Sequence, residues 1–199
     1  RDDKTDAMFF WTWFDRLNNY HPVNLTEFMK QHPEIRNDYY SPLWDPIGAF
    51  YWNESIYGYY RTSDPWVLRR QAELLANAMV DTIVTDNTNG GADLTFRSGY
   101  RSLYETWDKA QKDGVNVPKV SYMFSFSACG DATAQMTSIY SDIYRPGEYQ
   151  NLWFWWDGKP LWIAHTTQLN KHVNIEKEIA GFFTFRTPQP YYSIAKRTP

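Results

Sequence analysis

The chain has 199 residues, a formal net charge of −3 and an aromatic content of 19%, including 10 Trp and 15 Tyr. The acidic balance and the lack of any Lys/Arg run argue against a nucleic-acid partner, and no window reaches the roughly 18 apolar residues of a membrane span. One cysteine, Cys129, excludes an internal disulfide, and the scattered histidines show no metal-ligand spacing. We therefore expect no metal and no cofactor.

The chain opens with an aromatic strand and a long excursion. Residues 8–14, MFFWTWF, include Trp13 and have the length of a strand. Residues 17–63 contain several Pro and Asn and only short apolar runs, so we expect a loop with a small helix near 24–31. Loops of this length in a compact domain are usually functional.

A helix and a buried strand follow. Asp64 supplies a helix cap and Pro65 suits the first helical position, and apolar residues then recur at helical spacing. Residues 82–86, TIVTD, are the next strand. A second helix is predicted over 98–112, with Gly114 as its stop. Its apolar face carries Tyr100, Leu103, Tyr104, Trp107 and Ala110.

The second half repeats the pattern. A strand is predicted over 119–126 and a helix over 131–144, whose apolar positions are Met136, Ile139, Tyr140 and Ile143. Residues 153–164 read as a hairpin turned by Asp157-Gly158. A short helix near 174–180 then precedes a last strand over 181–186.

Alternating strands and helices at this spacing indicate a parallel α/β architecture. The five predicted strands are 8–14, 82–86, 119–126, 160–164 and 181–186. Because a closed (β/α)8 TIM-type barrel normally needs about 250 residues, we expect residues 1–199 to be a single domain forming the N-terminal part of such a barrel. Its partners would include the remaining barrel segment or another copy of the chain. A flavodoxin-like five-stranded sheet is the competing prediction.

The carboxyl ends of parallel strands meet on one face of a barrel, so polar residues there are candidate site residues. Asp86 and Glu54 are the candidate catalytic carboxylates, because glycosidic hydrolysis uses a pair of acids. Aromatic rings suit sugar binding, since they combine an apolar face with a polar edge. The candidate substrate-binding residues are Trp13, Trp52, Tyr57, Asn89, His165 and Arg186.

Each of the main candidates also has a structural interpretation. Asp86 could cap the next turn or pair with Arg186, and Glu54 could be a solvated loop side chain. His165 could be a satisfied core histidine. The aromatic excess could serve the core, although 10 Trp and 15 Tyr exceed what a small core easily hides.

Five stretches carry a family resemblance: IGAFYWNESIYGYY, DPWVLRRQAELLANAMVD, TDNTNG, WWDGKPLW and FFTFRTPQPYY. In this order they resemble bacterial glycoside-hydrolase-like (β/α)8 proteins loosely related to glycoside hydrolase families 99 and 71. The resemblance implies a secreted or periplasmic enzyme acting on complex polysaccharides or glycans, with further catalytic acids on later strands. It places these residues around the cleft: Glu54, Tyr57, Asp86, Asn89, His165 and Arg186. Two positions depart from the pattern, Met79 in place of Gly and Ser55 in place of Pro.

These observations predict a glycoside hydrolase, or its N-terminal part, with an aromatic-lined cleft. Two other classes remain open. A carbohydrate-binding protein without turnover would use the aromatic residues alone. A polysaccharide lyase would need a base and a charge neutraliser, for which His165 and Arg186 are the candidates.

Overall fold

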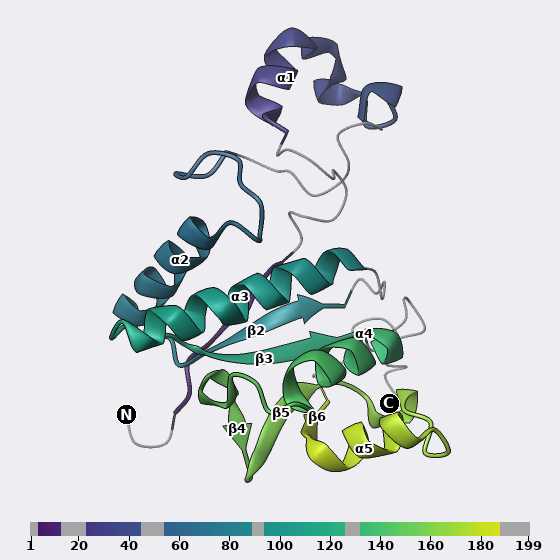
Figure 1. Cartoon of the computed structure of the whole chain (residues 1–199). Helices are drawn as coiled ribbons and strands as arrows, with labels where there is room; N and C mark the ends of the chain where they lie inside the picture. Colours follow the sequence, from purple (N-terminus) through teal and green to yellow (C-terminus); the bar gives the residue numbers. More distant parts are fainter. Residues whose placement is uncertain (1–3, 13–22, 45–53, 89–93, 126–131, 188–199) are drawn as a thin grey trace, which may run out of the picture. The chain divides into compact units, whose positions relative to one another are not determined.

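A computed structural model describes residues 4–12, 23–44, 54–88, 94–125 and 132–187 (Figure 1). Packing of the backbone divides the chain into two compact units. Unit 1 consists of Arg1–Phe10, Met79–Ala92 and Pro118–Pro199, and unit 2 consists of Trp11–Ala78 and Asp93–Val117. Each unit is described by itself.

Unit 1 is built on a six-stranded, mostly parallel sheet within the described residues. Its strands are β1 (Ala7–Phe10), β2 (Thr82–Asn87), β3 (Lys119–Phe124), β4 (Trp155–Trp156), β5 (Lys159–Ile163) and β6 (Thr184–Arg186). The parallel strands follow one another across the sheet as β1, β2, β3, β5 and β6. This confirms the predicted α/β class. The chain-order arrangement differs from the 2-1-3-4-5 order of a flavodoxin-like sheet.

The predicted Asp-Gly hairpin is present. Strand β4 runs antiparallel to β5, with Trp155 opposite Pro160 and Trp156 opposite Lys159. Asp157 and Gly158 form the turn with φ values of 50° and 77°, as a two-residue turn with both central residues left-handed requires. The hairpin lies where β5 begins, so it marks the amino end of the parallel strands.

The first and last predicted strands are shorter than expected. Strand β1 is Ala7–Phe10, so it covers only residues 8–10 of the strand predicted over 8–14, and residues 13–14 lie outside the described part of the chain. At the other end, Gly181 and Phe182 belong to helix α5 (Asn174–Phe182), so β6 begins at Thr184. The ring of Phe182 packs edge-on against Tyr140 at a centroid distance of 5.4 Å, and this contact favours continuing the helix.

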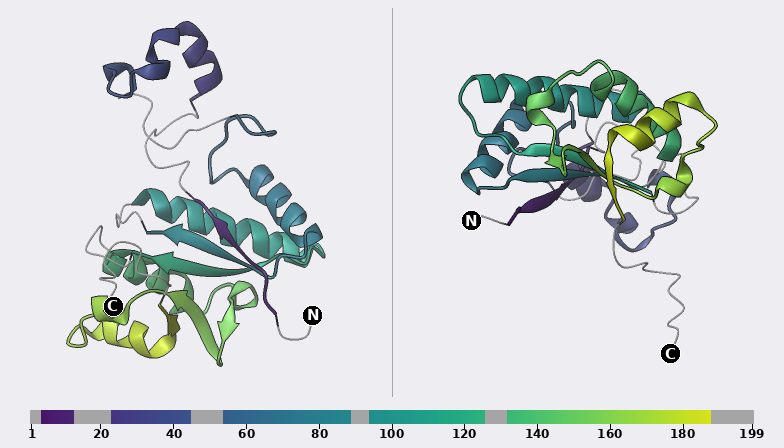
Figure 2. Two further views of the ribbon diagram at one scale, coloured as in Figure 1. Left: turned by 180° about the vertical axis from the view of Figure 1, so that it is seen from behind. Right: turned by 90° about the horizontal axis from the view of Figure 1, so that it is seen from below.

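Helical segments cover one face of the unit 1 sheet, and Figure 2 shows α4 and α5 on the same side of it. Besides α5, unit 1 contains α4 (Ala132–Ile139), the π-helical turn η3 (Tyr140–Tyr144), and the 3-10 turns η4 (Gln150–Leu152) and η5 (Thr166–Gln168). The four apolar residues predicted on the helix over 131–144 are all buried.

Trp162 of β5 is the centre of the core beneath these helices and is fully buried. Its ring stacks on Phe183 at 3.6 Å and meets Tyr144 edge-on at 5.5 Å. Phe124 of the neighbouring strand lies 4.9 Å away. A large part of the aromatic excess therefore forms the core of unit 1, as the structural interpretation of these residues had it.

Unit 2 contains the excursion and two longer helices. Its segments are α1 (Leu25–Gln31), η1 (Pro33–Asn37), η2 (Pro42–Trp44), α2 (Pro65–Asn77) and α3 (Leu94–Lys112). Asp64 caps α2 by accepting hydrogen bonds from the amides of Trp66 and Val67 at 2.9 and 3.2 Å, and Pro65 is the first helical residue. Gly114 ends α3 with a φ of 95°. Both signals were predicted.

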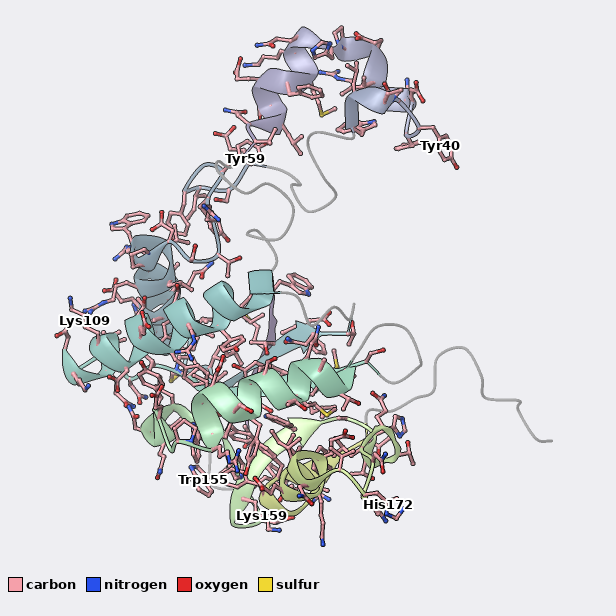
Figure 3. The ribbon with its side chains drawn as sticks, turned by 45° about the vertical axis from the view of Figure 1, so that its right-hand side comes forward. Tyr40, Tyr59, Lys109, Trp155, Lys159 and His172 are labelled. Carbon is pink, nitrogen blue, oxygen red and sulfur yellow. The ribbon has the colours of Figure 1, made fainter. Side chains whose placement is uncertain are left out.

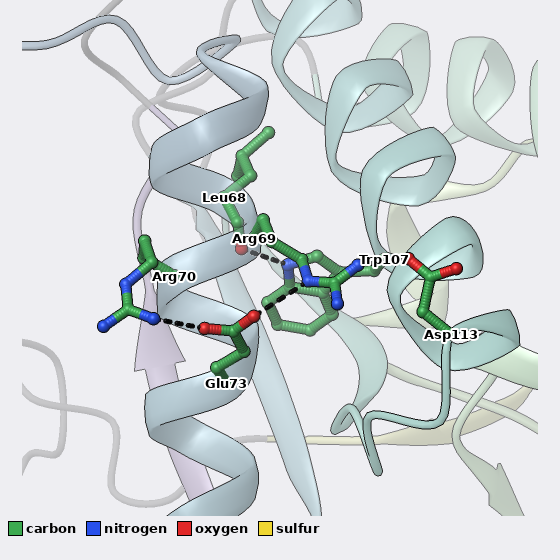
Figure 4. Close-up of polar contacts among 6 residues, drawn as sticks. All are labelled: Leu68, Arg69, Arg70, Glu73, Trp107 and Asp113. Atoms are coloured by element: carbon green, nitrogen blue, oxygen red, sulfur yellow. Dashed lines mark hydrogen bonds and ion pairs between the residues drawn. The ribbon is translucent and has the colours of Figure 1, made fainter.

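Helices α2 and α3 pack through the apolar face of α3, whose five predicted residues are all buried. The Trp107 indole donates a hydrogen bond to the carbonyl of Leu68 at 3.0 Å. Beside it, Arg69 bonds to Glu73 on its own helix at 3.0 Å and to Asp113 after α3 at 2.6 Å (Figure 4). The two helices are thus joined by one buried hydrogen bond and one half-exposed ion-pair network.

Helix α2 ends in an unfavourable backbone conformation. Met79 follows the cap residue Ala78 with a φ of 58°, in the left-handed region where helices usually place glycine. A side chain at such a φ costs about 1–2 kcal/mol.

Substitution Met79→Gly is expected to raise the free energy of unfolding by up to about 1 kcal/mol, because relief of the left-handed strain exceeds the added flexibility of the unfolded chain. Urea denaturation followed by circular dichroism measures the change. Ala78→Gly, at a right-handed position, is the matched control and should lower stability. Equal effects of the two substitutions would contradict the strain.

Acidification should weaken the ion pairs along helix α2. The Arg69 hydrogen bond, together with the charge of Arg70, lowers the pKa of the Glu73 carboxyl below its ordinary value of 4.5. A lowered folded-state pKa contributes stability above pH 4.5 that is lost as the pH falls through the folded value. Glu73→Gln should therefore destabilise the protein at pH 7 and lose its effect in acid.

Urea denaturation across pH 3–7 tests this expectation. Glu105→Gln removes an exposed carboxylate from α3 and serves as the control. A constant difference between Glu73→Gln and the unsubstituted protein across the whole pH range would show that the ion pair is not responsible.

Strand β1 is an open edge among the described strands, and it exposes Met8 and Phe9. Apolar edge strands pair with other chains, whereas a charge on the edge blocks pairing. We expect concentration-dependent self-association, which Phe9→Lys should reduce. Sedimentation velocity gives the measurement, and Tyr40→Lys places the same charge at an exposed ring of unit 2 as the control. A protein that stays monomeric at high concentration would contradict this expectation.

Candidate functional site

The candidate site is the face of the unit 1 sheet opposite the helices. Side chains alternate between the two faces of a strand, and residues paired in parallel register share a face. Because Trp162 and Phe124 face the helices, Ile163 and Met123 face the other way. Asp86, which pairs with Met123, shares that side.

Four residues form a continuous row on this face. Asp86 pairs with Met123, Met123 with Ile163, and Ile163 with Arg186. Asp86, Met123 and Ile163 are half-buried and Arg186 is exposed, whereas their neighbours on the helix face are largely buried. With strands about 4.8 Å apart, the row spans roughly 14 Å of backbone. We call it the carboxyl-end row, because each member lies at or near the end of its strand.

The row has an acidic residue, Asp86, at one end and a cationic residue, Arg186, at the other, with two apolar residues between them. Sequence reasoning named Asp86 and Arg186 but missed Met123 and Ile163. Alternation within each strand could have placed these two residues on a common face. The register between neighbouring strands places Met123 and Ile163 beside Asp86. A short stretch of sequence does not reveal this register.

Asp86 is held by the turn that follows β2. Its Oδ1 atom accepts hydrogen bonds from the Thr88 amide at 2.9 Å and from the Thr88 hydroxyl at 2.6 Å. The turn-capping role considered for Asp86 is therefore present. Thr88 follows the strand in the sequence, and an Asp two residues before Thr is a local signal for such a turn.

Arg186 is engaged at the hairpin. Its Nη2 atom forms an ion pair with Asp157 Oδ2 at 2.9 Å. Asp157 lies in the turn before β5, so the guanidinium reaches toward the amino end of the strands. The Arg186 side chain thus leaves its row position for the hairpin turn.

His165 lies two residues beyond Ile163, on extended backbone that begins η5. The side chain is half-buried, and its Nε2 atom is shielded from solvent. Gln168, three residues further on, donates from its side-chain Nε2 to the carbonyl of Ser125, the residue after β3.

Glu54 and Tyr57 belong to unit 2, unlike Asp86 and Arg186. The Glu54 carboxylate accepts a hydrogen bond from the Thr26 hydroxyl at 3.1 Å, and Thr26 also contacts the Tyr59 hydroxyl at 3.0 Å. Tyr57 meets the Trp66 ring edge-on at 5.4 Å. These contacts tie the loop before α2 to the start of α1.

The remaining candidates cannot be placed. Trp13, Trp52 and Asn89 lie outside the described residues. Other exposed rings occur in both units. Trp155 is 49% and Trp156 40% exposed on the hairpin, and Tyr40 is 94% exposed between η1 and η2 (Figure 3). Sequence composition could not separate these rings from the buried ones.

The described groups of unit 1 with a shifted pKa lie away from the carboxyl-end row. Burial lowers the pKa of the Lys119 ammonium, which lies at the amino end of β3. Burial, followed by the nearby charge of Glu178, raises the pKa of the Tyr140 hydroxyl in η3. Both residues hydrogen-bond within the fold, so these shifts are structural in origin.

Within the described ranges, His, Cys, Asp and Glu side chains do not gather in threes that could hold a metal ion. The helices of the same ranges are too short or too polar to span a bilayer.

The family resemblance rests on its five sequence stretches alone. No family model matches the chain. No curated protein sequence matches it either.

Proposed function

We propose that the chain is a glycan-active α/β protein of the glycoside hydrolase class, with the carboxyl-end row of unit 1 as its substrate face. The observation that carries the proposal is the position of Asp86. It is a half-buried carboxylate at the end of a parallel strand, beside an apolar surface formed by Met123 and Ile163. Active sites of β/α enzymes occupy this end of the strands.

Two further observations support this class. The strands follow chain order across the sheet, as in the first strands of a (β/α)8 barrel, and we propose that unit 1 is part of one. Exposed Trp and Tyr rings suit pyranose faces, since they offer flat apolar surface with a polar edge. A secreted or periplasmic location is part of the same proposal.

In this reaction Asp86 contributes one of the two carboxyl groups that glycosidic cleavage requires. The row contains one acid only, so a two-carboxylate mechanism draws its second acid from outside the row. Arg186 is ion-paired with Asp157 and His165 has a shielded Nε2, which weighs against a lyase built on these two side chains.

Carbohydrate binding without turnover is the second candidate. The single acid of the row favours it, together with the exposed rings of Trp155, Trp156 and Tyr40. A binding protein needs flat apolar surface and a few hydrogen-bonding groups, but no carboxyl pair.

A polysaccharide panel distinguishes these functions. The intact protein is incubated with each glycan, and released reducing ends and binding affinity are both measured. Asp86→Asn is expected to lower turnover by at least ~100-fold, as loss of an acid–base group does. Asp113→Asn removes a carboxylate at the end of α3 and is the control.

The results separate the candidates clearly. Turnover that survives Asp86→Asn would overturn the catalytic role of Asp86. Binding without any turnover would establish the second candidate. Loss of turnover in Glu54→Gln, measured alongside, would show that this carboxylate also takes part.

A further inference from the structure

We propose that Thr88 is a positioning residue for the Asp86 carboxylate. The inference rests on the proposed function, because it assigns how the acid of the carboxyl-end row is held for reaction. Thr88 does not itself need to contact the substrate. Its role is to fix the orientation of the carboxylate through two hydrogen bonds to one oxygen.

The contacts are specific to Oδ1 of Asp86. The backbone amide of Thr88 donates to this atom at 2.9 Å and the hydroxyl at 2.6 Å. Hydroxyl-to-carboxylate bonds of 2.5–2.7 Å are charge-assisted and stronger than neutral ones. Both donors therefore hold the same oxygen of the Asp86 carboxyl group.

Two bonds to a single oxygen also define the plane of the carboxyl group. The χ2 torsion of Asp is otherwise broad and poorly specified. Because Thr88 is the first residue after β2, its backbone position is set by the end of a strand that pairs with β3 as far as Asn87. Thr88, held at the end of the strand, therefore restrains the orientation of the Asp86 carboxylate.

The Thr88 hydroxyl forms a hydrogen bond to Asp86 that the turn itself does not require. The amide of residue 88 alone would complete an Asx turn, and any residue except proline supplies it. The second, shorter bond needs Ser or Thr. The amide bond is therefore the structural part of the contact, and every substitution except Pro keeps it. The hydroxyl bond is the part that orients the carboxylate.

Thr88→Val tests the hydroxyl, because it keeps the amide and the branched shape. We expect kcat on the best polysaccharide substrate to fall about 10- to 100-fold, the worth of a hydrogen bond to a charged group, with KM changed less than about twofold. Thr88→Ser keeps a hydroxyl at this position, so its kcat should match that of the unsubstituted protein. Thr88→Ala gives the same comparison if the valine variant folds poorly, and circular dichroism confirms folding of each.

The double variant Asp86→Asn/Thr88→Val isolates the coupling. If Thr88 acts through Asp86, the double variant should be no slower than Asp86→Asn alone. Additive losses would overturn the positioning role, and so would an unaltered kcat in Thr88→Val or a failure of Thr88→Ser to restore it. In each of these cases a large loss in Asp86→Asn would leave the hydrolase proposal standing.

Failure of the proposed function has a different signature. A wild-type protein without turnover, or an Asp86→Asn variant with full turnover, would overturn both proposals together. The two sets of outcomes do not overlap.

Discussion

Burial of the aromatic side chains on one face of the unit 1 sheet determines where every other residue of that sheet lies. Trp162 is fully enclosed by rings from β3, η3 and the residue after α5. Since strand side chains alternate, enclosing Trp162 and Phe124 directs Ile163 and Met123 to the opposite face. A slip of one residue would expose the core rings and bury Asp86. The carboxyl-end row is thus a consequence of core packing.

The same sheet explains why its candidate residues differ in what they can do. Asp86 ends an inner strand, and Thr88 holds it in place through the following turn. Arg186 occupies the far end of the row, but its guanidinium reaches the hairpin turn at Asp157. The row therefore presents a fixed acid and an apolar surface, while its basic residue serves the hairpin. This asymmetry supports the role proposed for Asp86.

The sequence-based predictions were correct where the structure depends on interactions between residues close together in the chain. The Asp64-Pro65 start, the buried face of α3 and the Asp157-Gly158 turn were all predicted, because capping, helical periodicity and turn geometry involve neighbouring residues. It failed at the boundary of β6, where packing of Phe182 extends α5 beyond its predicted end. Met79 likewise adopts a left-handed conformation that its residue type does not suggest.

By itself, the sequence determined the α/β class, the order of most elements and the presence of Asp86 at a strand end. Only the tertiary structure decided which aromatic rings are buried and which strands are neighbours. It also decided that Met123 and Ile163 share a row with Asp86, and that Arg186 pairs with Asp157. The physical reason is separation along the chain. Paired strands lie tens of residues apart, and their register depends on the packing of a whole face, which no short segment records.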